Sequence, residues 1–367
     1  MLRSEHSLVE TNDVAALNHL RPHGPLHWIF SKLPSAGPWS IIGALSSEDR
    51  FMAAAEQTIS VRPGADAHFL YIQPEELSTN SFLDATKKKL TVRRKDATTN
   101  LPTAKIVEAG NLLSKDHAII NLAYELVERC HPNVVLDIST MPKRFFFPLL
   151  SVLIQSPHVS NLIATNTAPE RYCEELANNA AEWVPLPMFN GDPLEEPTDA
   201  TLIIGVGYQP LNVKDILERI RTLRVAIRLM LPFPSLHPGF IPNWNFINHI
   251  KSEWGTGINE NQAPPIEIVR VATHDVSLAF DRLVQHSEEG RKEALIMAPY
   301  GPKAISLAMC LLGIAREKRL GISTEIGYTQ PSFYHPDYSS GVATRDGFPD
   351  VTAYCLRLNG RDLYQIS

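Results

Sequence analysis

The sequence predicts an α/β protein of two tandem Rossmann-like domains, each a doubly wound parallel sheet, followed by a C-terminal β-hairpin. Three observations lead to this fold class. Short apolar, β-branched segments alternate with helical segments, which is typical of a parallel sheet covered on both faces. The alternation is interrupted by a linker and then returns in the same order. Landmark residues also recur at a nearly constant offset along the 367 residues.

The first series of elements begins at Trp39. Its strands are short runs rich in Val, Ile and Leu, and its helices carry apolar residues at helical spacing. We expect strands at 39–45, 67–74, 104–110, 133–139 and 159–167, and helices at 47–59, 116–130 and 142–155.

The second series follows a linker at 185–200, which is rich in Pro and acidic residues. We expect strands at 201–207, 225–232, 265–272, 293–299 and 323–330, and helices at 212–223, 274–290 and 302–318. Two unrelated domains of this type would share the order of elements but not their spacing. Five landmarks recur 159 to 162 residues apart, which indicates an internal duplication: Gly43 with Gly205, Asp116 with Asp275, Pro142–Lys143 with Pro302–Lys303, Pro169 with Pro331, and Tyr172 with Tyr334.

The two ends of the chain are additions to these domains. Residues 1–38 form an N-terminal extension that we expect to pack on the body of the protein. Asn359-Gly360, between two alternating segments, predicts a type I′ hairpin. We expect this hairpin to extend the second sheet or to cap the interface. The predicted units are therefore 1–38, 39–190, 191–341 and the hairpin unit 342–367.

Composition narrows the range of functions. A net charge of −6 argues against a broad basic surface, so extended nucleic acid is not an expected partner. The four cysteines are far apart and form no C-x-x-C pair, which fits a reducing cytoplasm better than a disulfide framework. The apolar runs fall well short of the ~20 residues that span a bilayer. We therefore expect a cytoplasmic protein that does not contact membranes.

Cofactor and metal motifs are missing from the sequence. No Walker A motif occurs, and in "GVGYQP" (residues 205–210) Pro210 replaces the third glycine of a dinucleotide-binding turn. His23 and His27 are four residues apart, but Gly24 and Pro25 between them argue against the helix that would put both on one face of a zinc site. We expect neither a cofactor nor a metal.

The candidate ligand-binding residues follow the predicted strands, because open parallel sheets bind ligands beyond the carboxyl ends of their strands. They are Ser47, Arg50, Ser139, Thr140, Lys143, Asn166, Gln209, Tyr300, Gly301, Lys303, Tyr328, Gln330 and Tyr334.

The two turns after the fourth strands are the most informative. In "STMPKR" and "APYGPKA", Pro142 and Pro302 suit the first helical position, and Gly301 allows a close backbone approach. Each turn offers backbone N–H donors beside a lysine, which suits a phosphate or another anion. The alternative is that Lys143 and Lys303 extend into solvent.

The second half also carries a set of aromatic and amide side chains after its strands. Tyrosine faces stack on nucleobases, and Gln or Asn side chains read base edges. The alternative is that the tyrosines fill a domain interface with their hydroxyls in water. Acid–base catalysis by Glu48, Asp49, Arg50 and Asp137 is a weaker hypothesis, because Asp49-Arg50 also suits a salt-bridged helix start.

A Ser/Thr or Gly turn after strand four, followed by Lys and a helix ("DISTMPKRFFFPLL" and "MAPYGPKAISLAMCLLG"), resembles the CRISPR-associated Rossmann fold (CARF) sensor domains of prokaryotic defence proteins. The resemblance implies a pseudo-twofold pocket between two such domains for a nucleotide signal such as a cyclic oligoadenylate. It also implies that this pocket is lined by Ser139, Thr140 and Lys143 from one half and Tyr300, Gly301 and Lys303 from the other.

Three hypotheses about function follow. The first is a nucleotide-binding or nucleotide-sensing module in antiviral defence, with an anionic small molecule as partner. The second is a metal-independent enzyme on a nucleotide or phosphorylated small molecule, such as a ring-opening phosphodiesterase. The third is a structural subunit of a larger defence complex, or a homodimer, in which the two additions are docking surfaces. The sequence does not decide whether the ligand is turned over.

Overall fold

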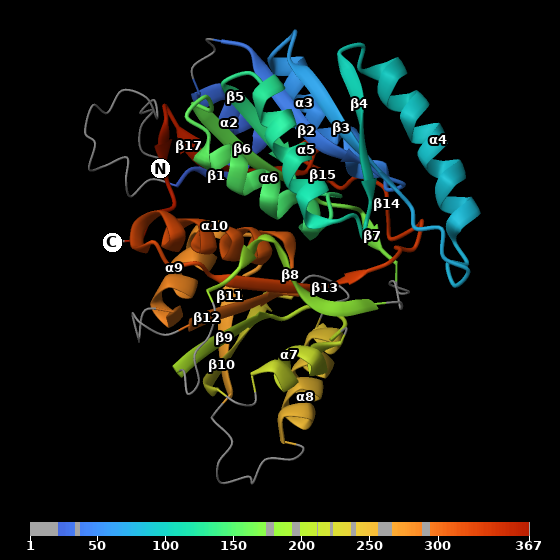
Figure 1. The fold of residues 1–367 in the computed structure, drawn as a ribbon. Coiled ribbons are helices and arrows are strands. Elements are labelled where there is room, and N and C mark those ends of the chain that lie inside the picture. The colour runs from blue at the N-terminus through green and yellow to red at the C-terminus, as the bar shows by residue number, and fades with distance from the viewer. Residues whose placement is uncertain are drawn as a thin grey trace.

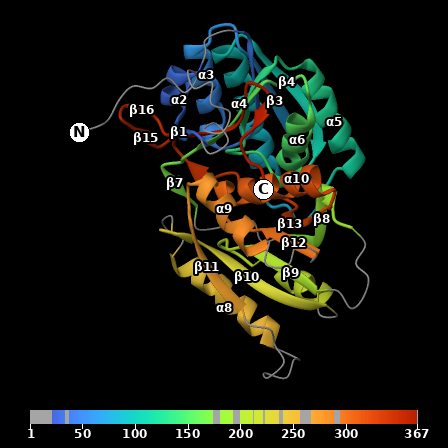
Figure 2. The same ribbon diagram turned by 90° about the vertical axis from the view of Figure 1, so that its left-hand side faces the viewer.

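The computed structural model describes residues 21–33, 37–173, 180–192, 199–210, 212–220, 223–235, 240–255, 266–287 and 294–366. In Figures 1 and 2 two α/β layers lie one above the other, with helix α10 at their boundary. The chain is an α/β protein with two Rossmann-like sheets, as the sequence predicts.

The first sheet has the strand order β1-β17-β6-β5-β2-β3-β4. Its parallel part consists of β2 (Trp39–Leu45), β3 (Asp66–Gln73), β4 (Ala104–Asn111), β5 (Asn133–Asp137) and β6 (Asn161–Thr167). Numbered along the chain, these five strands lie in the order 5-4-1-2-3, which is the order of a doubly wound sheet. The order reverses between β2 and β5, and a binding crevice is expected beyond the carboxyl ends of these two strands.

The second sheet repeats this order as β11-β10-β9-β12-β13-β8. Its parallel strands are β9 (Asp199–Gly205), β10 (Arg224–Phe233), β11 (Ile266–Ala272), β12 (Ala294–Pro299) and β13 (Glu325–Pro331). Here the order reverses between β9 and β12. Unrelated doubly wound domains share this order as well, so the internal duplication still rests on the spacing of the five landmarks.

Each sheet is completed by an antiparallel strand that follows the other sheet in the chain. β8 (Ala180–Asn190) follows β6 but pairs with β13, while β17 (Val351–Leu358) follows β13 but pairs with β6. Where the two connections cross, β7 (Arg171–Tyr172) pairs with β14 (Ser339–Ser340). We call this arrangement the strand exchange.

The strand exchange corrects two expectations. The C-terminal hairpin extends the first sheet and not the second, although its turn is as predicted: Asn359 and Gly360, before β18 (Arg361–Asp362), both have positive φ. Residues 180–190, assigned to the first domain and in part to the linker, form an edge of the second sheet. Pairing partners so far apart in the chain leave no local signal in the sequence.

The helices agree with prediction except where apolar periodicity is weak. The described helices are α2 (Leu26–Lys32), η1 (Asp49–Met52), α3 (Ala53–Val61), α4 (Leu83–Asn100), α5 (Asp116–Arg129), α6 (Lys143–Gln155), α7 (Val213–Arg219), α8 (Phe240–Gly255), α9 (Val276–Ser287) and α10 (Lys303–Leu320). Three of these helices were not predicted: α2, α4 and α8. α4 is polar on nearly all sides and buries few apolar residues, Leu90 and Ala97, so periodicity could not reveal it.

The remaining short strands belong to the additions. β1 (His23–Pro25), in the N-terminal extension, pairs with β17, which confirms that this part of the extension packs on the body. Residues 1–20 of the extension lie outside the described residues. β15 (Thr344–Arg345) and β16 (Phe348–Pro349) form a small hairpin. In the described part of the chain, no helix is long and apolar enough to cross a bilayer.

α6 and α10 are parallel neighbours at the boundary between the two layers. Cys310 Sγ lies 3.8 Å from Phe147 O, and Lys318 Nζ donates to Ile154 O at 3.2 Å. Because residue numbers rise together in both helices across these contacts, the helices run in the same direction. Their N-termini, and the ends of the strands that precede them, therefore face the same side.

Candidate functional site

A cavity of about 280 Å³ lies where the carboxyl ends of both sheets meet. All of the predicted site residues except Gln330 line it: Ser47, Arg50, Ser139, Thr140, Lys143, Asn166, Gln209, Tyr300, Gly301, Lys303, Tyr328 and Tyr334. Gln330 lies behind the wall, where its Nε2 donates to the Tyr334 hydroxyl at 3.0 Å. The strand order and the turns thus bring together residues from two distant parts of the chain.

Both proline–lysine turns open on this cavity. α6 begins at Lys143 and α10 at Lys303, so Pro142 and Pro302 are N-cap residues and not the first helical residues that we expected. The first N–H groups of a helix have no partner within it, and they carry the positive end of its dipole. Arg144, the second cation of the first turn, does not line the cavity. It pairs with Asp116 at 2.6 Å.

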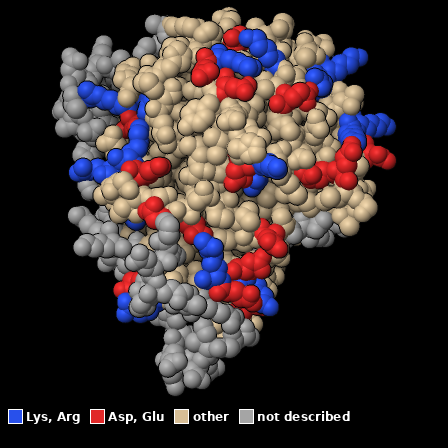
Figure 3. All heavy atoms as spheres, viewed as in Figure 1, with Lys and Arg blue, Asp and Glu red and all other residues tan. Residues whose placement is uncertain are grey.

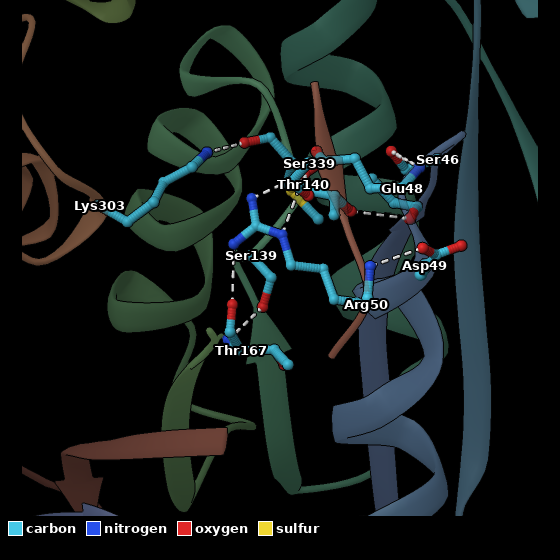
Figure 4. A network of polar contacts seen from close by, with 12 residues as sticks. Ser46, Glu48, Asp49, Arg50, Ser139, Thr140, Thr167, Lys303 and Ser339 are labelled. Atoms are coloured by element: carbon cyan, nitrogen blue, oxygen red, sulfur yellow. Dashed lines mark hydrogen bonds and ion pairs between the residues drawn. The ribbon is translucent and has the colours of Figure 1, made fainter. Parts of the chain in front are cut away.

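The two lysines have different partners. The Lys143 ammonium lies 4.3 Å from the Tyr328 ring centroid, and no described residue accepts a hydrogen bond from it. Burial lowers the pKa of Lys143 to about 7. Lys303 donates to the carbonyl oxygen of Met141 (Figure 4) and lies 5.1 Å from the Phe146 ring. Burial, and next the charge of Lys143, hold its pKa well below the usual value.

Arg50 is held inside the protein. Its guanidinium, only 3% exposed, donates to Glu48 Oε2 at 3.0 and 2.9 Å and to Thr167 O at 2.8 Å. The Ser339 hydroxyl donates to the same carboxylate (Figure 4). Burial alone would lower the pKa of Arg50, but the Glu48 charge raises it above its usual value. Asp49 and Arg50 are both salt-bridged at this helix start, as the alternative to a catalytic role predicted, but with other partners and not with each other.

The Asp49 side chain contacts residues other than Arg50. Its carboxylate pairs with Arg93 of α4 and accepts a hydrogen bond from Gly341 N at 2.7 Å. These contacts, and those of Arg50, tie the turn after β2 to α4, β6 and the segment around β14. Arg50 lines the cavity as a neutralised structural cation, which does not support the role of ligand-binding cation that the sequence suggested.

The hydroxyls after β5 are also engaged by the fold. Ser139 Oγ donates to the buried Asp137 carboxylate and accepts from Thr167 N at 2.7 Å, and Thr140 Oγ1 donates to Ala44 O at 3.2 Å. Burial raises the pKa of Asp137 to about 6, although the Ser139 hydrogen bonds oppose this. Ser139 and Thr140 shape the turn, and their hydroxyl protons are directed at protein atoms.

The tyrosines form a connected aromatic wall. Tyr300 and Tyr328 have ring centroids 5.6 Å apart, and Tyr338 lies 6.1 Å from both Tyr334 and Tyr172. Burial raises the pKa of Tyr334 to about 12, so the hydroxyl stays neutral at ordinary pH. These tyrosines pack against one another and also line the cavity, and their stacking on a nucleobase stays a prediction.

Gly207 and Gly301 let two backbone turns of the second half pack closely against each other. A Cβ on Gly207 would lie 2.3 Å from Tyr300 O, and one on Gly301 would lie 3.0 Å from Val206 O. The turns after β9 and β12 therefore touch each other. The close approach that we expected Gly301 to offer to a ligand is made by the protein itself.

Two lining residues come from the helices that the sequence analysis missed. Thr86 and Asn243 are each the fourth residue of their helix, α4 and α8, and both line the cavity. Because neither helix was predicted, no signal marked these residues. The described residues contain no cluster of three or more side chains suited to hold a metal ion.

The sheets and the shared cavity define the class: an α/β protein of two Rossmann-like halves with one site between them. Neither protein-family models nor curated proteins match the sequence. Among solved structures, a universal stress protein from Archaeoglobus fulgidus is similar at 8% identity, over 80% of this chain and 96% of that chain, with a TM-score of 0.24. An A-type ketoreductase of a modular polyketide synthase has 11% identity over 84% and 83%, with a TM-score of 0.21. The α/β fold class is therefore assigned from the order of the strands in the two sheets.

Proposed function

We propose that the protein binds a nucleotide or a related phosphorylated small molecule in this cavity and acts as a sensor of it. One observation carries the proposal: the N-termini of the parallel helices α6 and α10 open on a single cavity, and each begins with a lysine. Helix N-termini favour anions through their unpaired N–H groups and their dipole. A phosphate between the two turns would meet both helix ends.

The charge balance supports an anionic ligand. After burial, the charge of Lys143 is the next largest cause of the lowered pKa of Lys303, and no described carboxylate forms a salt bridge with either lysine. Among the nearby charged groups, Arg50 and Glu48 neutralise each other at 2.9 Å. A phosphate would supply the missing negative charge and would favour the protonated form of both amines. The surface charges in Figure 3 are of mixed sign, which agrees with a compact ligand better than with a long polyanion.

The hydroxyls and carboxylates at the cavity are engaged by the protein, which favours binding over catalysis by these groups. Among the described residues, Lys143 is the unengaged exception. The hydroxyls of Ser139 and Thr140 donate to protein atoms, and Glu48 and Asp137 accept several hydrogen bonds each. A nucleophile or a base needs a free lone pair near the substrate, and an acid needs a proton that it can transfer. A ring-opening phosphodiesterase remains the competing function, and product analysis by chromatography with protein in excess over ligand separates the two.

The test is calorimetric titration of AMP, ATP and cyclic nucleotides into wild type and Lys143→Gln/Lys303→Gln. We expect at least one nucleotide to bind, and its affinity to fall by tenfold or more in the double variant, since charge-assisted contacts contribute roughly 1.5–3 kcal/mol each. Lys214→Gln is the matched control, because Lys214 is 62% exposed and does not line the cavity. Equal affinity in all three proteins would overturn the proposed site.

A further inference from the structure

Asn243 is a buried amide without a partner at the wall of the cavity. It is 1% exposed, and neither its Nδ2 nor its Oδ1 has a hydrogen-bond partner among the described residues. An unpaired buried polar group costs roughly 1–3 kcal/mol, and buried amides are nearly always paired. A cavity-lining residue whose side-chain donor and acceptor are both unpaired points to a group that is supplied from outside the chain.

A second asparagine in the same wall gives the contrast. Asn80 also lines the cavity and is buried, but its Nδ2 donates to Glu75 O at 3.1 Å and its Oδ1 accepts from Phe82 N at 3.1 Å. Asn80 therefore fixes a turn of the protein itself. Asn243 makes no such contact, although both residues have the same chemistry and comparable burial.

The position of Asn243 suits recognition of a flat ring. Phe246, three residues later on the same face of α8, packs with its ring centroid 5.6 Å from that of Tyr300. Tyr208 and His274 line the same cavity. The first half has Thr86 at the fourth position of its corresponding helix, so the carboxamide of Asn243 has no counterpart there.

We propose that Asn243 is the specificity-determining residue of the site and reads the base edge of a nucleotide, on which a donor lies beside an acceptor. A carboxamide pairs with such an edge through two hydrogen bonds. The inference rests on the proposed function, in which the phosphate lies at the helix N-termini. Because Asn243 occurs in one half only, the ligand is bound in one orientation, with its base toward the second half.

The experiment compares ligands that share the phosphate but differ in the base. The 5′-monophosphates of adenosine, guanosine, cytidine and uridine, and ribose 5-phosphate, are titrated into wild type, Asn243→Ala and Asn243→Leu. In wild type we expect one nucleotide to bind at least tenfold more tightly than ribose 5-phosphate, and both variants to lose that preference while keeping their affinity for ribose 5-phosphate.

Thermal unfolding of the ligand-free variants distinguishes recognition from a structural role. Asn243→Leu removes two unpaired buried polar atoms, so its melting temperature should equal or exceed that of wild type. A preference for the base that survives in both variants, or no preference in wild type, would overturn the assignment of Asn243 while leaving phosphate binding intact. Failure of ribose 5-phosphate and of every nucleotide to bind wild type would overturn the proposed function, and the role of Asn243 with it.

Discussion

The Lys143 ammonium, at the start of α6, lies 4.3 Å from the ring centroid of Tyr328, which belongs to β13 of the second sheet. A cation over an aromatic face is attracted by the ring quadrupole, but this gain is modest compared with the cost of burying the charge. Burial lowers the pKa of the Lys143 amine to about 7, despite this contact. The amine is therefore partly neutral at physiological pH. Four predictions follow from this and neighbouring contacts.

Ligand binding is expected to take up a proton. The pKa of free Lys143 is about 7, and a bound phosphate would raise it, so binding above that pH must be coupled to protonation. The affinity for cyclic AMP, a phosphodiester of constant charge, should fall as pH rises from about 7 to 9, by up to tenfold per unit. Calorimetry in buffers of different ionisation enthalpy measures the proton. A flat profile in wild type would contradict the prediction, and Lys143→Gln should have a shallower profile than wild type, because only Lys303 is left to take up a proton.

Removal of Lys143 is expected to stabilise the ligand-free protein. The folded-state pKa lies below the unfolded value, so the unfolded chain binds more protons between about pH 7 and 10.5, and the contribution of Lys143 to stability increases with pH. Lys143→Met should therefore melt above wild type at pH 6, and the difference should shrink toward pH 10. Melting curves at several pH values test this. A difference that grows with pH would mean that the sign is wrong.

Loss of one partner from the buried pair of Glu48 and Arg50 is expected to destabilise the fold strongly. Arg50→Ala leaves the Glu48 carboxylate buried without its cation, which costs about 3–5 kcal/mol in comparable cases. The free energy of unfolding in urea measures the change. Arg129→Ala is the control, because the exposed pair of Arg129 and Glu125 contributes less than about 0.5 kcal/mol. Similar losses of stability in both variants would contradict a large contribution of the buried pair of Glu48 and Arg50.

Gly207→Ala is expected to disturb the contact between the turns after β9 and β12. The added Cβ would lie 2.3 Å from the backbone oxygen of Tyr300, so the turns must move apart, at a cost on the order of 1–3 kcal/mol or more. Gly255→Ala meets nothing within 4 Å and should be neutral. Chemical denaturation compares the two variants, and equal stability would show that the turns separate without cost. Because both turns line the cavity, nucleotide affinity should fall with Gly207→Ala as well.

Local patterns in the sequence predicted the parallel strands of both sheets and most helices, and twelve of the thirteen candidate site residues line the cavity. This worked because buried parallel strands are continuous apolar runs, and because the residues after such strands face one edge of the sheet. Lys143 and Lys303 were found because the repeat placed them at equivalent positions. The roles of single residues were harder to predict. Arg50 and Ser139 were expected to meet a ligand, but each is engaged by a carboxylate two residues earlier, Glu48 or Asp137, and by Thr167 of β6.

The parts that the sequence could not predict depend on contacts between distant segments. α4 carries little apolar periodicity, so Thr86 and its helix left no pattern, and Asn243 was missed together with α8. The pairing of β8 with β13, and of β17 with β6, depends on which sheet offers an open edge after the chain has folded. Neither strand differs in composition from one that would pair with its own half.

The strand exchange also constrains how this protein can be inherited or engineered. A gene fragment that ended after the first set of strands would encode a sheet with an open edge at β6 and, in β8, a strand with no sheet to join. Recombination therefore has to transfer both halves together. The same geometry offers a route to a split reporter: two fragments cut between β8 and β9 would each remain incomplete until they meet, so recovery of the fold would report their encounter.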